Sequence, residues 1–374
     1  MTMLSKLAGP FQVKEYFHWI SNALDFGDDL LEDLSFLRTM QRTLLPLPWR
    51  GEWQPPLEKL LPQLRPFNVD ALAGKKIGIV ATGGSGAMIS TLGVMRACEE
   101  AGLEIAAISA CSGSALYLAP IAAGLSAEEA IDFVFGWRSE DYIDARWSEL
   151  FRIPLHLGKG FTGVLDMEVI ERLYHERLGG VLLGDLPIPF YANIWDVDHN
   201  RVVHMGTRST PDVRLARLVR AAVSLPIFAR PLEMDGTLYG DGGVINIFPA
   251  ETLVEMHPEI DYFIGINCFY PENFEGEDLS GWDRLTFSPI RVSPQPRHGQ
   301  HLELARMNLR LIEDRCLMLH PVAYQDIKGI KFYEQFADRS RWPEFVVRGY
   351  YNARRNLALM DRQMASRAAA GAPS

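Results

Sequence analysis

Apolar residues in the middle of the chain form two short runs, and each run leads through a turn of small residues into a helical pattern. The first run covers residues 77–81, and the helical pattern after it, residues 87–101, ends at Gly102. The second run covers residues 105–109 and leads into a helical pattern that ends near Gly124. Two successive strand-turn-helix units predict a parallel sheet covered by helices, which is an α/β domain.

Further elements are expected towards the C-terminus, and the chain contains no internal repeat. They are strands at 190–194 and 202–205 joined by a turn, a helix at about 212–223, a strand ending at Tyr239, a strand at 262–267, a mobile acidic loop at 271–281 and a long helix at roughly 302–319.

The two ends of the chain differ from this central part. Residues 1–70 are expected to be a helical extension, because leucines recur at helical spacing before Pro46. We expect this leucine face to pack on the main domain. A role at a membrane surface is the disfavoured alternative, because the polar face carries four acidic residues, Asp28, Asp29, Glu32 and Asp33. Residues 71–360 are the expected catalytic domain, and residues 361–374 a disordered tail.

Composition excludes several classes of protein. The net charge of −10 argues against nucleic acid as a partner, because phosphates attract clustered positive charge. Four cysteines without CxxC spacing indicate neither a disulfide framework nor a zinc ribbon, and the N-terminus lacks the pattern of a secretory signal. A cytoplasmic protein is therefore expected.

Residues 105–127 carry no charge and are long enough to cross a bilayer, but a buried strand followed by a buried helix explains them better.

A cluster of glycines follows the first strand. Gly83, Gly84, Ser85 and Gly86, here called the Gly loop, precede a helix, and backbone N–H groups at such a place form an anion site. The anion is a phosphate or an oxyanion. The spacing does not fit a dinucleotide fingerprint or a P-loop. A tight turn that needs glycine is the plain alternative.

A candidate nucleophile lies at the second strand-to-helix turn. Ser112 has small neighbours at Ala110 and Ser114, as a nucleophile elbow requires, although neither is the usual glycine. A serine that caps the helix is the simpler interpretation of this turn. The Gly loop on the adjacent strand favours the elbow instead. Cys111 is a weaker candidate, since the neighbour of an elbow nucleophile points into the sheet.

A candidate base follows a later strand. Asp241 precedes two glycines, so its carboxylate is expected on a turn with its oxygens facing a site, where it activates a hydroxyl. An Asx turn is the alternative explanation.

Together these residues resemble the patatin-like phospholipase family, from about Lys76 to Asn246 and more weakly to about Met360. The resemblance implies a three-layer α/β/α fold with a central, mostly parallel sheet. It also implies a lipid acyl hydrolase in which Ser112 is the nucleophile, Asp241 is the base, and the Gly loop binds oxyanion and substrate. No cofactor and no metal are implied. The substrate would be a lipid or another apolar ester, and contact with a lipid surface would accompany it. The shared segments are the Gly loop, 93–95, the elbow, 221–228 and 239–246.

The sequence departs from the family pattern at two places. The arginine of the Gly loop is replaced by Ala87, and both elbow glycines are replaced. A weakly catalytic or non-catalytic protein that binds a lipid or a partner is therefore the alternative function. Two other sites are disfavoured. A calcium loop starting at Asp196 would lack the glycine and the glutamate that such a loop requires. A Ser-Asp-His triad would need His257, which is explained more simply as a residue at a helix end.

Overall fold

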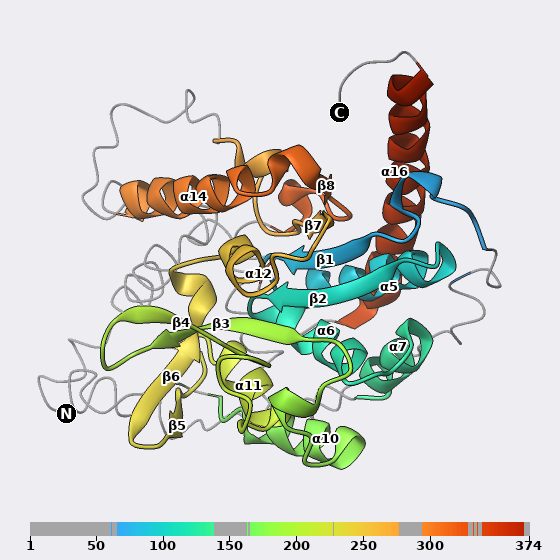
Figure 1. Cartoon of the computed structure of the whole chain (residues 1–374). Coiled ribbons are helices and arrows are strands. Elements are labelled where there is room, and N and C mark those ends of the chain that lie inside the picture. The colour runs from blue at the N-terminus through green and yellow to red at the C-terminus, as the bar shows by residue number, and fades with distance from the viewer. Residues whose placement is uncertain are drawn as a thin grey trace, which may run out of the picture.

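Eight strands form one mixed sheet in the computed structural model, which describes residues 61, 66–137, 163, 165–226, 228–276, 294–327, 332, 335 and 339–369. The strand order is β5-β6-β3-β2-β1-β7-β8, with β4 paired to β3 (Figure 1). Five neighbouring strands are parallel: β8 (Cys316–Leu319), β7 (Tyr262–Ile266), β1 (Lys76–Ala81), β2 (Glu104–Ala110) and β3 (Phe190–Asp196). Three strands are antiparallel to their neighbours: β4 (Arg201–Gly206), β5 (Leu232–Met234) and β6 (Thr237–Asp241).

Helices cover both faces of the sheet (Figure 1). Strand residues alternate between the two faces: Ile77 and Ile79 of β1 join one buried cluster, while Val80 joins the other. The first face carries α5 (Ser90–Glu100), α6 (Gly113–Ala122), α7 (Ala127–Phe135), α10 (Glu168–Leu178), α11 (Leu215–Ala222) and α16 (Trp342–Ala369). The second face carries α12 (Ala250–Met256) and α14 (Pro294–Arg310). The expected three-layer α/β/α fold with a mostly parallel sheet is therefore confirmed.

Short 3-10 turns connect several of these elements. They are Asp70–Leu72, Gly86–Ile89, Leu183–Asp185, Gly242–Val244, Glu272–Phe274, Glu313–Arg315, Tyr324–Asp326 and Arg339–Arg341. The turn at Gly86–Ile89 occupies the start of the helix that was expected over 87–101, so α5 itself begins only at Ser90.

Two glycines allow α5 and α16 to pack backbone against backbone. A Cβ atom on Gly93 would lie 2.0 Å from the carbonyl oxygen of Val346, and one on Gly349 would lie 2.0 Å from that of Ser90. Such approaches exclude any side chain. The contact holds α16 against the helix that follows the Gly loop.

The expectation of a long helix over 302–319 is wrong. Helix α14 begins earlier, at Pro294, and ends at Arg310, while Cys316–Leu319 forms the edge strand β8. β8 pairs with β7, Phe263 opposite Cys316, so a tertiary contact decides the state of a short apolar run that fits either a helix or a strand.

The C-terminal expectation also differs from the structure. Helix α16 runs to Ala369, so residues 361–369 are helical where a disordered tail was expected. Met360 is buried and Met364 packs against the same core, and these contacts continue the apolar face of the helix. Residues 370–374 and most of the predicted extension 1–70, including its leucine face, lie outside the described residues.

The uncharged stretch 105–127 forms most of β2 and all of α6, followed by the start of α7. Most of it is buried within the domain. In the part of the chain that the structure describes, no helix combines the length and apolarity needed to span a bilayer. Of the acidic loop predicted at 271–281, residues 271–276 are described and include a 3-10 turn, and the remainder lies outside the described residues.

Candidate active site

Ser112 lies at a sharp turn between β2 and α6, with φ of 49° and ψ of −123°. A residue with a side chain rarely adopts positive φ, so the surrounding contacts must hold this conformation. Ser114 supplies such contacts, because its hydroxyl accepts from the Cys111 amide at 2.9 Å and lies 2.8 Å from the Cys111 carbonyl oxygen. The residue that replaces an elbow glycine therefore stabilises the turn.

The Ser112 hydroxyl does not cap the helix. No amide of α6 donates to it, although Ser112 occupies the N-cap position. It donates instead to Oδ2 of Asp241, at 2.5 Å. The structure thus brings together the two side chains that the sequence singled out from places 129 residues apart.

Asp241 is at the end of β6 and is 1% exposed. Its Oδ1 atom accepts from the Gly243 amide at 2.8 Å, so the Asx-type turn is also present, and its own amide donates to the Ser224 carbonyl at 3.0 Å. The first bond holds one carboxylate oxygen, the second holds the backbone of the residue, and Oδ2 is left for Ser112.

Burial raises the pKa of Asp241 from an ordinary value near 3.8 to about 7, although the hydrogen bonds from Ser112 and Gly243 oppose the shift. A buried carboxylate loses the hydration that stabilises its charge, and no cation is among the groups that compensate it. Near neutral pH the site therefore holds protonated and ionised forms in comparable amounts.

This shift predicts a pH-dependent stability. The unfolded chain releases the Asp241 proton near pH 4 and the folded chain only near pH 7, so folding loses stability as pH rises between these values. We expect Asp241→Asn to be more stable than the wild type at pH 8, by on the order of 4 kcal/mol at most, and equally stable near pH 3.

Urea unfolding followed by circular dichroism at several pH values measures this difference. Burial also raises the pKa of Glu251 to about 7. This residue contributes equally to both proteins, so its effect on stability cancels in the comparison. An Asp241→Asn variant whose stability tracks that of the wild type at every pH would show that Asp241 ionises normally.

The Gly loop passes directly beside Ser112. A Cβ atom on Gly83 would lie 3.2 Å from the Cβ of Ser112, and one on Gly113 would lie 2.1 Å from the carbonyl oxygen of Gly84. Within the described residues, the amides of Gly84, Ser85 and Gly86 have no hydrogen-bond acceptor. The loop therefore presents unused N–H donors close to the Ser112 hydroxyl, as an anion site requires.

Contacts behind the loop restrict its movement. The Ser85 hydroxyl lies 3.4 Å from Oε1 of Gln335, and a Cβ on Gly86 would lie 2.1 Å from the Gln335 carbonyl oxygen. Ala87, the position at which the family pattern has arginine, is 1% exposed and belongs to the core. Its small side chain is therefore packed within that core.

The two alternative reactive residues are engaged elsewhere. Cys111 is fully buried, burial raises its thiol pKa well above the usual range, and its Sγ lies 3.6 Å from the Asn246 carbonyl oxygen. His257 uses both ring nitrogens, Nε2 with the Tyr191 hydroxyl and Nδ1 with Glu259, each at 2.9 Å. Neither nitrogen is available to activate Ser112.

The predicted turn after β3 joins it to β4 as a hairpin. Asp196 interacts with His199 and with Arg201, at 2.9 Å and 3.1 Å, so its oxygens already have cationic or polar partners. Across the described residues, no group of three or more potential metal-binding side chains comes together.

Three asparagines, Asn193, Asn246 and Asn308, form a buried cluster behind the Asp241 turn, and the sequence predicted no role for them. The Asn246 carbonyl accepts from the Asn193 side chain, and the Asn246 side chain donates to Oε1 of Glu251 at 2.6 Å and accepts from Asn308 at 3.1 Å. These bonds tie the end of the Asp241 turn to β3, α12 and α14. The only sequence signal was the position of Asn246 in a segment shared with the family.

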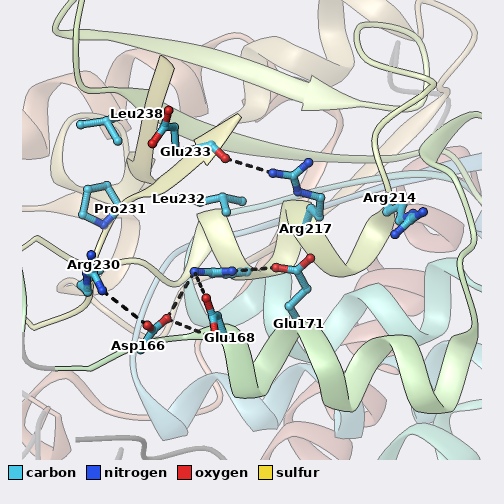
Figure 2. Close-up of a pocket in the computed structure, with 11 residues that line it drawn as sticks. Asp166, Glu168, Glu171, Arg214, Arg217, Arg230, Pro231, Leu232, Glu233 and Leu238 are labelled. Carbon is cyan, nitrogen blue, oxygen red and sulfur yellow. Dashed lines mark hydrogen bonds and ion pairs between the residues drawn. The ribbon is translucent and has the colours of Figure 1, made fainter. Parts of the chain in front are cut away.

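A charged cavity of about 460 Å³ lies between α10, α11 and β5, and none of Ser112, Asp241 and the Gly loop lines it (Figure 2). Arg220 lines it and lies 2.9 Å from Glu171 and 3.3 Å from Asp166. The Arg220 carbonyl accepts from the Ser224 hydroxyl, and the Ser224 carbonyl accepts from Asp241. This ion-pair cluster therefore anchors the helix end that holds the Asp241 backbone.

Comparison with known proteins points to the same family that the sequence resembles. The profile of the family described as patatin-like phospholipase matches residues 79–254, which include the Gly loop, Ser112 and Asp241. Lysophospholipase NTE1 of Cryptococcus neoformans var. neoformans serotype D is 28% identical over 215 residues, 56% of this chain and 12% of that protein. Patatin-like phospholipase domain-containing protein 6 of Mus musculus is 27% identical over 250 residues, 66% of this chain and 17% of that protein.

Among solved structures, human GIVD cytosolic phospholipase A2 aligns with a TM-score of 0.46 at 12% identity, covering 90% of this chain and 64% of that one. The chain spans less than a fifth of the length of the two curated relatives. The family match rests on the segment that carries the elbow, the Gly loop and the Asp241 turn. Residues 79–254 therefore match the patatin-like phospholipase family.

Proposed function

We propose that the protein is a serine acyl hydrolase that cleaves lipid esters, with Ser112 as nucleophile and Asp241 as base. The observation that carries the proposal is the 2.5 Å hydrogen bond from the Ser112 hydroxyl to a buried carboxylate, made at a turn of positive φ. A serine hydroxyl is a poor nucleophile until a neighbouring base accepts its proton, and this arrangement supplies that base.

The reaction proceeds in two halves. Ser112 Oγ attacks the ester carbonyl while its proton passes to Asp241 Oδ2, and the amides of Gly84, Ser85 and Gly86 donate to the tetrahedral oxyanion. The intermediate collapses as Asp241 returns the proton to the leaving alcohol, which leaves an acyl-enzyme. A water molecule then gives a proton to Asp241 and attacks the acyl carbon, and collapse releases the carboxylic acid and restores the Ser112 hydroxyl.

The environment of Asp241 suits this role. A base is most effective when its pKa lies near the working pH, and burial raises the pKa of Asp241 to about 7. An ordinary exposed aspartate would be a much weaker base towards a hydroxyl. Burial of Asp241 therefore lowers the stability of the fold but makes the carboxylate a stronger base for the Ser112 proton.

The family match and the names of two relatives support a lipid ester as substrate, a lysophospholipid being the first to test. We also propose that residues 71–360 form the catalytic domain and that the protein acts in a reducing, cytoplasmic setting. All four cysteines are free, and that supports a reducing compartment.

A direct assay tests the proposal. The protein is incubated with lysophosphatidylcholine and, separately, with a soluble p-nitrophenyl ester, and released fatty acid and nitrophenol are measured. We expect hydrolysis of both. Lipid binding without release of either product would favour the alternative of a non-catalytic lipid-binding protein.

Gly113, the residue after the nucleophile, lies so close to the Gly loop that a side chain there should lower activity. We expect Gly113→Ala to lower kcat by about 100- to 1000-fold, the cost of losing an oxyanion donor, because its Cβ would displace the Gly84 carbonyl and with it the loop amides. Gly180→Ala is the matched control, since a Cβ there meets only His175, at 3.8 Å. Equal activity of the two variants in the p-nitrophenyl ester assay would contradict a role for the loop.

A further inference from the structure

Helix α16 carries an exposed stripe that the proposed chemistry does not use. Tyr351, Arg355, Leu359, Arg362 and Ser366 follow one another at intervals of three or four residues, so they share one face, and all are exposed. Tyr351 is 52% and Leu359 36% exposed, which makes them two of the few large apolar side chains open to solvent among the described residues. We call this set the α16 stripe.

The opposite face of α16 explains why the stripe faces outward. Phe345, Tyr350 and Leu357 are buried in the main core, and Asp361 accepts from the amide of Ala71. The helix is thus fixed from one side. Figure 1 shows its later part extending beyond the strands, away from α10.

The charge of the stripe is opposite to that of the chain. The protein has a net charge of −10, yet the two arginines of the stripe have no carboxylate within ion-pair distance among the described residues. α16 has only two acidic residues: Glu344, which pairs with Arg341 and Arg348, and Asp361 on the buried side. A local positive surface with exposed apolar side chains between the charges is typical of a helix that lies on an anionic membrane.

A cavity of about 690 Å³ lies beside the stripe, between α16, the end of β8 and the turn Glu272–Phe274. On its wall two buried polar atoms, Nε2 of His320 and Oδ1 of Asn352, have no hydrogen-bond partner. Tyr351, Arg355 and Leu359 of the stripe line the cavity, together with Arg348 and one acidic residue, Glu272. Orphaned buried polar atoms cost free energy unless a ligand or water satisfies them, and a head group with phosphate oxygens and hydroxyls offers both acceptors and donors.

We propose that the α16 stripe docks the protein on an anionic phospholipid surface, with one head group seated in the cavity beside Arg355. The arginines meet the lipid phosphates, while Tyr351 and Leu359 enter the interfacial region. This surface consists of α16 and the cavity beside it, and it does not depend on the chemistry of Ser112. The proposal thus places the contact with the membrane on helix α16.

Co-sedimentation with vesicles tests the docking surface. We expect the wild-type protein to bind vesicles of phosphatidylcholine mixed with phosphatidylglycerol, to bind pure phosphatidylcholine much less, and to lose binding at high salt. Each arginine near an anionic surface accounts for about a fivefold change in affinity, so R355A/R362A should bind about 25-fold more weakly. R172A/R177A, which removes two exposed arginines from α10, should bind as the wild type does.

Three results would overturn the proposal: equal binding to neutral and anionic vesicles, wild-type binding by R355A/R362A, or binding of soluble glycerol phosphate without binding of vesicles. A dimer that R355A/R362A abolishes, without vesicle binding by the wild type, would assign the stripe to a second copy of the chain. The melting temperature of R355A/R362A verifies its fold. Each protein is also measured with Ser112→Ala in place, so that no lipid ester is hydrolysed and the outcome does not depend on whether the protein is a hydrolase.

Discussion

Replacing Ser112 by alanine should lower ester hydrolysis by at least about 10⁴-fold, because the nucleophile is lost while the rest of the site stays in place. Ser112 is partly exposed and its hydroxyl bonds only to Asp241 in the described structure, so its removal opens no buried cavity. The variant should fold normally. Its kcat with the p-nitrophenyl ester, together with its circular dichroism spectrum, measures both expectations.

Ser109→Ala is the matched control for this variant. Ser109 lies on β2, three residues before Ser112, and its hydroxyl donates to the Pro249 carbonyl at 2.8 Å on the second face of the sheet. We expect it to keep most of the activity. Substantial hydrolysis by Ser112→Ala would refute the assignment of the nucleophile.

Asp241→Asn should lose about 10³- to 10⁴-fold in kcat/KM, since the amide keeps the shape of the carboxyl group but accepts no proton. Because Ser112 and Asp241 act as one unit, the double variant should be scarcely worse than either single variant. Wild-type kcat/KM should rise tenfold per pH unit below pH 7 and level off above it, since the base acts only when ionised and the pKa of Asp241 is about 7.

Two controls accompany the profile. His257→Gln should keep the inflection near pH 7, which separates the Asp241 carboxylate from a histidine side chain as the source of the inflection. Asp185→Asn, at an exposed aspartate on a turn, should behave as the wild type does. A profile whose inflection disappears in His257→Gln, combined with an active Asp241→Asn, would identify a histidine-dependent hydrolase.

Local sequence signals were sufficient to predict β1, β2 and the turns that follow them. An apolar run ending in glycines or other small residues has few structural solutions, and the Gly loop and the elbow both formed where they were expected. The pairing of Ser112 with Asp241 is different. It depends on β6 pairing with β3 next to β2, a strand order that no local pattern encodes, and it could be anticipated only through resemblance to a family.

Other features required the tertiary structure. Cys316–Leu319 is too short for its pattern to distinguish a strand from a helix, and only its pairing with β7 decides. Ser114 departs from the elbow pattern, yet its hydroxyl bonds to the backbone of Cys111 and so stabilises the turn. The raised pKa of Asp241 also follows from burial, which a sequence does not display.

Labelling with a serine-directed fluorophosphonate probe tests the central claim most directly, because the probe reacts only where a serine has both a base and an oxyanion site. After labelling of the folded wild-type protein and proteolysis, mass spectrometry should find a single adduct, on Ser112. The rate of labelling should rise with pH through about 7, as Asp241 ionises, and no adduct should form in Ser112→Ala. An adduct on another residue, or no adduct in the folded wild-type protein, would contradict the account.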